Sequence, residues 1–203
     1  MRRPLRLVPL AASALLALLG ALAEAAPAEG AAKPKVRRYE DLTNPLLGPD
    51  YAAWLLGAVS QMSSEAEVDE FLSLKRDEDA AAFVERFWQK RDLSPGREGN
   101  LAREVFDSRS EEADRLYSES AILGRHTARG AVFVLFGAPA KVEFDITSLR
   151  GNQALEVWRY DEKAPYGLNG QKPSGTFRFI KQGGLTVPFT GHTRIRPKVR
   201  PPG

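Results

Sequence analysis

The residues of this 203-residue chain best suited to proton transfer near neutral pH are two histidines, His126 and His192. Ser118, Ser120 and Thr127 lie close to His126 in the sequence, so a hydroxyl nucleophile activated by an imidazole is one possible chemistry. The chain has no G-x-S-x-G turn to expose such a serine, and it has no cysteine. We therefore expect no catalytic triad, no metal site and no cofactor site.

Carboxylates offer a second chemistry, because a suitably spaced pair can cleave a glycan. Glu143, Asp145, Glu156 and Asp161 fall on or beside segments that resemble strands. Acidic residues in such places are usually solvated charges at the edge of a sheet. An enzyme should show a cavity with two carboxylates about 5–9 Å apart and raised pKa values. A binding module should instead show an exposed apolar patch or an open sheet edge.

Charged residues also lie where helices are expected to meet. Arg91 and Asp92 follow the apolar stripe of one predicted helix, and Arg109 interrupts the stripe of the next. A bidentate pair between Arg109 and Asp92 would fix the angle between these helices. Asn100 is expected to cap or close the intervening loop, 93–100.

The start of the chain has the features of a secretory signal peptide. Basic residues at positions 2, 3 and 6 precede an apolar stretch, and Ala23-Glu24-Ala25 supplies small residues at alternate positions. We expect cleavage near Ala25, no membrane anchor afterwards, and an exported protein, periplasmic or extracellular in a bacterium. Residues 26–49 are rich in Pro, Ala and Gly and are interpreted as a disordered linker.

The helix-forming part of the chain is expected at 50–123. Tyr51 and Trp54 begin a helical apolar pattern, and Ser64 with Glu67 forms a capping box at the next helix. An acidic turn at Asp77 precedes the third helix, which carries Ala80, Phe83, Val84, Phe87 and Trp88 on one side. The fourth helix is predicted at about 98–122.

The second half, 124–190, is predicted to be rich in β-strands. Three short runs, 131–136, 156–160 and 176–180, have strand-like composition, and Gly183-Gly184 predicts a hairpin turn. Gly130 and Gly137 are assigned to the ends of the first of these strands. The expected fold class is α+β, with about four helices packed on a small antiparallel sheet of three to four strands. Residues 191–203 form a basic tail expected to be disordered.

Charge divides the chain in the same way. Residues 64–123 carry nine basic and sixteen acidic side chains (net charge −7), and 124–203 carry thirteen basic and five acidic ones (net charge +8). The two halves can neutralise each other within one fold, or the basic half can face an anionic envelope polymer. Nucleic acid is an unsuitable partner for an exported protein.

The order of these motifs resembles the GWxTD-domain family of exported bacterial proteins over roughly 51–187. Where that motif is expected, the chain has Gly124-Arg125-His126-Thr127-Ala128, which keeps the Gly and Thr but not the Trp and Asp. The resemblance implies a set of signature residues with mainly structural roles: Phe87, Trp88, Arg91, Asp92, Asn100, Arg109, Gly124, Thr127, Arg129, Gly130, Gly137, Pro139, Trp158 and Tyr160.

The family resemblance implies no known activity. We therefore expect a non-enzymatic binding or adaptor module of the cell envelope, whose partner is an envelope protein or an anionic polymer. The basic tail could add a peripheral contact. The alternative is a carboxylate-dependent envelope hydrolase acting on a glycan.

Overall fold

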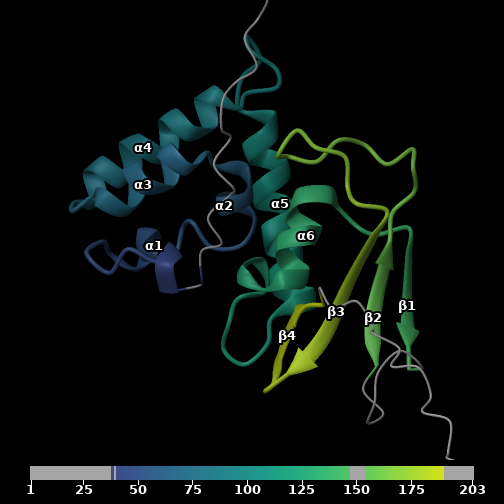
Figure 1. Cartoon of the computed structure of the whole chain (residues 1–203). Helices are drawn as coiled ribbons and strands as arrows, with labels where there is room; N and C mark the ends of the chain where they lie inside the picture. The colour runs from purple at the N-terminus through teal and green to yellow at the C-terminus, as the bar shows by residue number, and fades with distance from the viewer. Residues whose placement is uncertain (1–37, 39, 147–153, 190–203) are drawn as a thin grey trace, which may run out of the picture. The chain divides into compact units, whose positions relative to one another are not determined.

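The computed structural model describes residues 38, 40–146 and 154–189. These residues form six α-helices and one four-stranded antiparallel sheet, which confirms the α+β fold class (Figure 1). The predicted signal peptide (1–25), the basic tail (191–203) and His192 lie outside the described residues.

The first four helices are α1 (Pro49–Ala52), α2 (Ala58–Met62), α3 (Glu65–Ser73) and α4 (Asp77–Lys90). The capping box at the start of α3 is confirmed: Ser64 Oγ accepts from the Glu67 N–H, and the Glu67 carboxylate accepts from the Ser64 N–H. Aromatic rings join these helices. Trp54 packs against Phe71, Phe83 and Phe87, with ring centroids 4.9–5.9 Å apart.

The chain packs on this helical core before Asp50, although its composition places 26–49 in a linker. A short 3-10 helix, η1, spans Glu40–Leu42. Asn44 is 2% exposed, and its side-chain amide donates to the carbonyl oxygens of Phe71 and Leu74 at 3.0 and 2.9 Å. Composition missed this segment because the few residues that hold it, the buried Asn44 and Leu47 and the partly buried Leu42, form no regular apolar pattern.

The longest helix, α5 (Leu101–Tyr117), is shorter than the predicted 98–122. It ends at Ser118, whose backbone is extended (φ −61°, ψ 133°), and the positive φ angles of Ser120 and Ala121, 49° and 66°, keep the following residues out of the helix. The 3-10 helix η2 (Gly124–His126) follows, and it leads directly into α6 (Ala128–Phe136).

The strand predicted at 131–136 is wrong, because these residues form most of α6. A short apolar run is compatible with either a strand or a buried helix, and the β-branched valines favoured the strand. Two tertiary facts decide otherwise. Thr127 caps the first turn by accepting from the Gly130 N–H at 3.1 Å, and residues 130–135 are all buried, so a helix that is apolar all round is stable here.

The sheet has the order β1-β2-β3-β4, with β1 (Lys141–Asp145), β2 (Leu155–Arg159), β3 (Thr176–Gln182) and β4 (Leu185–Pro188). The strands expected at 156–160 and 176–180 and the Gly183-Gly184 hairpin turn are confirmed, and both glycines have positive φ. The sequence reasoning missed β1.

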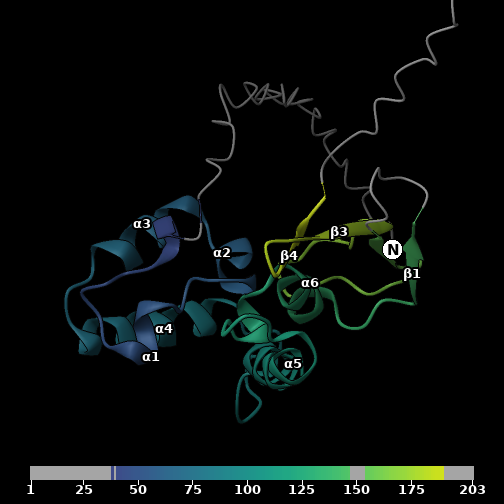
Figure 2. The same ribbon diagram turned by 90° about the horizontal axis from the view of Figure 1, so that it is seen from below.

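Helix α6 lies between α5 and the sheet (Figure 2). Phe133 on α6 makes an edge-on ring contact with Tyr117 of α5, and Tyr117 in turn contacts Trp158 of β2. Trp158 is 1% exposed and packs against Phe179 of β3, so this signature residue lies in the core.

Candidate functional site

The signature residues fall into three clusters instead of one site. The first lies where α3 and α4 meet the loop before α5 and contains Phe87, Trp88, Arg91, Asp92 and Asn100. The second surrounds the start of α6 and contains Gly124, Thr127, Arg129 and Gly130. The third joins the end of α6 to α5 and the sheet. It contains Arg109, Gly137 and Tyr160, whereas Pro139 follows two residues after Gly137 in the sequence and Trp158 packs in the core on β2.

In the first cluster, Arg91 binds Glu67 of α3. The guanidinium donates to both carboxylate oxygens at 3.1 and 2.8 Å and to the Met62 carbonyl oxygen at 2.7 Å, and it lies 3.5 Å from the centre of the Phe87 ring. Both side chains of the ion pair are about 15% exposed or less. Burial raises the pKa of Glu67, but the hydrogen bonds from Arg91, Ser64 and Lys90 outweigh it and lower that pKa to about 2.

The predicted capping role of Asn100 is confirmed. Its side-chain oxygen accepts from the Arg103 N–H at 3.0 Å, and its amide donates to the Trp88 carbonyl oxygen at 2.6 Å. One side chain thus starts α5 and ties it to the end of α4.

The predicted ion pair between Arg109 and Asp92 is wrong. Arg109 instead donates to the carbonyl oxygens of Val134 and Leu135 in α6, at 3.1 and 3.0 Å. Asp92 accepts from the Ser94 N–H in its own loop. The prediction failed because it assumed that Arg109 needs a carboxylate, whereas the unpaired carbonyls at a helix C-terminus also attract a cation.

The third cluster closes around this arginine. Gly137 ends α6 with a φ of 79°, and a Cβ at this position would lie 3.2 Å from the Arg109 guanidinium. Tyr160 donates its hydroxyl to the Gly137 carbonyl oxygen at 2.8 Å. Gly137 therefore serves the backbone at the end of a helix, and not at the end of a strand as predicted.

Gly124 and Thr127, the two motif residues that this chain keeps, have structural explanations, and so does the nearby Gly130. A Cβ at Gly124 would lie 1.8 Å from the Ala113 carbonyl oxygen, and one at Gly130 would lie 1.7 Å from the Gly124 carbonyl oxygen. Only glycine permits these close approaches. Thr127 donates to the Gly124 carbonyl and caps α6.

Arg129 connects the start of α6 to strand β2 and, through Glu119, to strand β4. Its guanidinium pairs with Glu156 of β2 at 3.1 Å and with Glu119 at 3.4 Å. Glu119 also accepts from the N–H and hydroxyl of Thr186 in β4, and Glu156 accepts from the indole N–H of Trp158. These partners keep both carboxylates engaged in holding the fold.

His126 does not form a nucleophile pair in the described structure. The hydroxyls of Ser118 and Thr127 donate to backbone carbonyls, at Asp114 and Gly124 respectively. Burial, followed by the nearby Arg125, lowers the pKa of His126, so its imidazole is neutral at pH 7.

Two of the four carboxylates considered for glycan cleavage, Glu143 and Glu156, do not share one face of the sheet. Glu143 lies opposite Val157 and Phe144 lies opposite Glu156, so Glu143 and Glu156 project from opposite faces of the sheet. Glu143 bonds to Lys141 and Arg159, and these bonds lower its pKa to about 2. Elsewhere, burial raises the pKa of Asp107, but the two glutamates of its cavity, Glu85 and Glu104, form ion pairs with Arg103 and Arg97.

The most exposed apolar surface of the sheet belongs to β1. Val142, Phe144 and the following Ile146 are 46%, 67% and 68% exposed. Among the described residues β1 pairs with β2 alone, so its outer edge is open. The signal was present in the sequence, because apolar residues alternate with Lys141, Glu143 and Asp145 at the period of a strand.

These clusters define the class of the protein. It is an α+β domain in which helix α6 is held between helix α5 and the antiparallel sheet. The chain matches the GWxTD domain over residues 49–186, and it belongs to that family. No curated protein and no solved structure matches it. None of the helices in the described part of the chain is long and apolar enough to cross a membrane.

Proposed function

We propose that this protein is a non-enzymatic binding module of the bacterial cell envelope that takes up an extended segment of a partner protein along β1. The observation that carries the proposal is the open edge of β1 with its exposed Val142, Phe144 and Ile146. Proteins usually shield an edge strand with charges, prolines or a covering segment, so an apolar open edge is typical of an interaction site.

The two edges of the sheet differ. At β4, Glu119 accepts from the Thr186 N–H at 2.9 Å, and the Ser120 hydroxyl donates to the Gly184 carbonyl at 3.1 Å. The segment after α5 therefore covers part of the β4 edge. An added strand would gain more new backbone hydrogen bonds at β1.

A hollow beside β1 supports the same choice. It has a volume of about 440 Å³ and lies on the sheet face that carries Phe144, Glu156 and Phe179, with Arg129 and Lys181 also on its wall. A strand paired with β1 would place alternate side chains on this face, so one of them could enter the hollow.

Export belongs to the same proposal. The basic, apolar and small-residue segments of positions 1–25 support cleavage near Ala25 and a periplasmic or extracellular location. Mass measurement of the protein purified from its native host tests this. A mature chain that begins near Ala26 is expected, and an intact Met1 in the membrane fraction would contradict it.

The binding function can be tested by affinity capture from envelope extract with matched variants. Phe144→Lys places a charge on the open edge, and Leu93→Lys makes the same change at an equally exposed residue (68%) in the loop after α4. The partner should be retained by the wild type and by Leu93→Lys, and reduced about tenfold or more by Phe144→Lys. Equal capture by all three proteins would reject β1 as the binding surface.

A further inference from the structure

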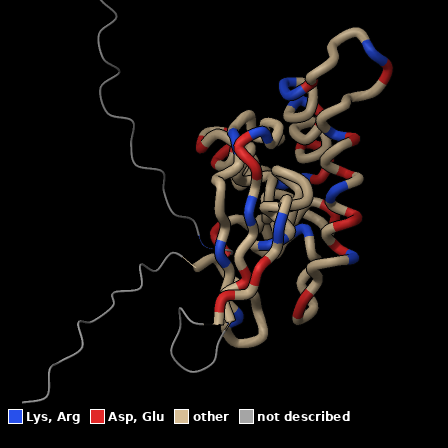
Figure 3. Tube along the Cα trace, turned by 90° about the vertical axis from the view of Figure 1, so that its right-hand side faces the viewer, with Lys and Arg blue, Asp and Glu red and all other residues tan. Residues whose placement is uncertain are grey.

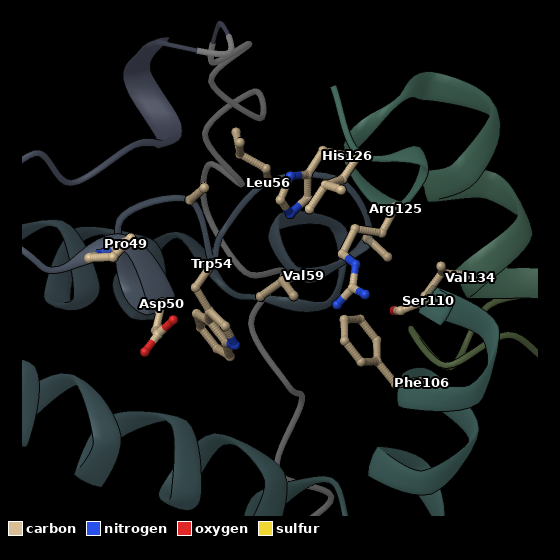
Figure 4. A pocket seen from close by; sticks show the side chains of 13 residues that line it. Pro49, Asp50, Trp54, Leu56, Val59, Phe106, Ser110, Arg125, His126 and Val134 are labelled. Carbon is tan, nitrogen blue, oxygen red and sulfur yellow. The ribbon is translucent and has the colours of Figure 1, made fainter. Parts of the chain in front are cut away.

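A cavity of about 320 Å³ lies between the α1–α2 segment and the α5–η2–α6 segment. Figure 4 shows Trp54 and Val59 on one side of it and Phe106 and Ser110 on the other, with His126 at another part of the wall. Pockets for small molecules begin at about this volume, so it suits a single ring system better than a lipid or a polymer.

Two aromatic rings form preorganised walls. Trp54 is held from behind by Phe71 and Phe87, whose ring centroids are each 4.9 Å away. Phe106 is held by Trp88 at 5.0 Å. Both Trp54 and Phe106 remain partly exposed where they line the cavity. A flat ring entering between such walls would make edge-on or stacked contacts without reordering them.

The polar groups of the wall are few and carry little uncompensated charge. Arg125 is paired with Asp114 at 2.5 Å, and the lowered pKa of His126 leaves its imidazole neutral. Asp50 lies exposed at the rim and disfavours an anion. These features select a neutral ligand.

Ser110 supplies a hydrogen-bonding group that could orient a ligand in the cavity. Its side chain is completely buried, and its hydroxyl oxygen has no hydrogen-bond partner among the described residues. A buried polar group without a partner costs free energy, and a ligand that reaches it recovers that cost.

We propose that this cavity is a binding site for a small neutral aromatic molecule of about the size of indole, whose N–H or O–H group bonds to Ser110. The site is separate from the β1 edge. Arg125, which stands where the motif has Trp, pairs with Asp114 and lies on the cavity wall near Phe106 (Figure 4).

Calorimetric titration with indole, supported by amide chemical shifts, tests the site in the full chain. Indole should bind, and shifts should appear first at Trp54, Phe106 and Ser110. Ala53→Phe, which fills the cavity from its rim, should abolish this binding, and Ala81→Phe on the exposed side of α4 should leave it unchanged. Ser110→Ala should weaken indole binding about five- to tenfold while leaving toluene binding unchanged.

Arg125→Trp provides a second, independent variant, because it restores the motif residue and should exclude indole. Its circular dichroism spectrum must match the wild type. Indole that binds all variants with equal affinity, or that shifts residues elsewhere, would overturn the proposal. Phe144→Lys should bind indole normally, so failure here and failure of the proposed partner binding are distinguishable.

Discussion

Arg91 and Arg109 bind different kinds of partner. Arg91 meets a carboxylate, Glu67, and thereby joins the end of α4 to the start of α3. Arg109 meets backbone carbonyls at the end of α6, and burial lowers its pKa without a carboxylate to oppose that effect. The loss in free energy of unfolding when either arginine is replaced should therefore depend on the partner that it leaves behind.

Arg109→Ala should lower the free energy of unfolding by about 2–3 kcal/mol, because two helix-end carbonyls lose a charged donor. Asp92→Ala should cost about 1 kcal/mol, because it loses only the bond from the Ser94 N–H. Since the two residues have separate partners, their effects should add within about 0.5 kcal/mol in urea denaturation. A coupling energy above about 1 kcal/mol would show that they interact after all.

The Glu67–Arg91 pair should make stability depend on pH. The pKa of Glu67 is about 2 when folded, against 4.5 ordinarily, so its contribution is complete above the ordinary value and is lost as pH falls toward the folded value. Glu67→Gln should therefore be less stable than the wild type above pH about 5, by about 2 kcal/mol after screening by water, and the difference should shrink toward pH about 2.

Denaturant melts across this pH range measure the effect. Glu85→Gln is the matched control, because Glu85 is 58% exposed in its pair with Arg103 and should show little change. A wild-type advantage that stays constant from pH about 5 to about 2 would contradict the assignment of Glu67.

Helix α6 depends on its surroundings more than on its own propensities. Three of its nine residues are β-branched or glycine, and its interior face and its outer face are both apolar. It is stable because α5 and the sheet bury it, because Thr127 caps its start and because Arg109 binds its end. The close approach of Gly130 to Gly124 sets the angle at which it leaves η2.

Gly130→Ala separates propensity from packing. Helix propensity alone predicts that alanine stabilises this position by about 1 kcal/mol. The 1.7 Å approach to the Gly124 carbonyl predicts the opposite, a loss of about 3 kcal/mol or more. Gly175→Ala is the control, since no atom lies within 4 Å of a Cβ there, and it should change stability by less than about 1 kcal/mol. Thermal and urea melts that rank the two variants in the other order would refute the packing explanation.

Charge in the whole molecule is less divided than the sequence halves indicate. Lys and Arg alternate with Asp and Glu along both helices and strands (Figure 3). Arg125 and Arg129, from the basic half, pair with Asp114 and Glu119 from the acidic half, which supports mutual neutralisation. Five cations of the basic half lie outside the described residues: Arg150, Arg194, Arg196, Lys198 and Arg200.

Truncation after Gly191 removes four of these cations. The shortened chain should keep the melting temperature of the full protein, since the tail's basic and proline-containing composition cannot supply a core. It should lose most of its retention on anionic vesicles at low salt, because each cation contributes on the order of 1 kcal/mol near such a surface and salt screens the attraction. Equal retention of both forms would assign any surface contact to the folded domain.

Patterns in the sequence were sufficient to predict the fold class, the start of α3, the cap at Asn100 and the strands β2 and β3. Each of these depends on residues within a few positions of one another, so a local pattern is sufficient evidence. The helix at 131–136 could not be predicted in this way, because burial on all sides removes the periodicity that distinguishes a helix from a strand. The same holds for the partners of Arg109 and, among the residues that the structure describes, for the open edge of β1 and the Ser110 hydroxyl without a partner, because these features arise only after distant segments have come together.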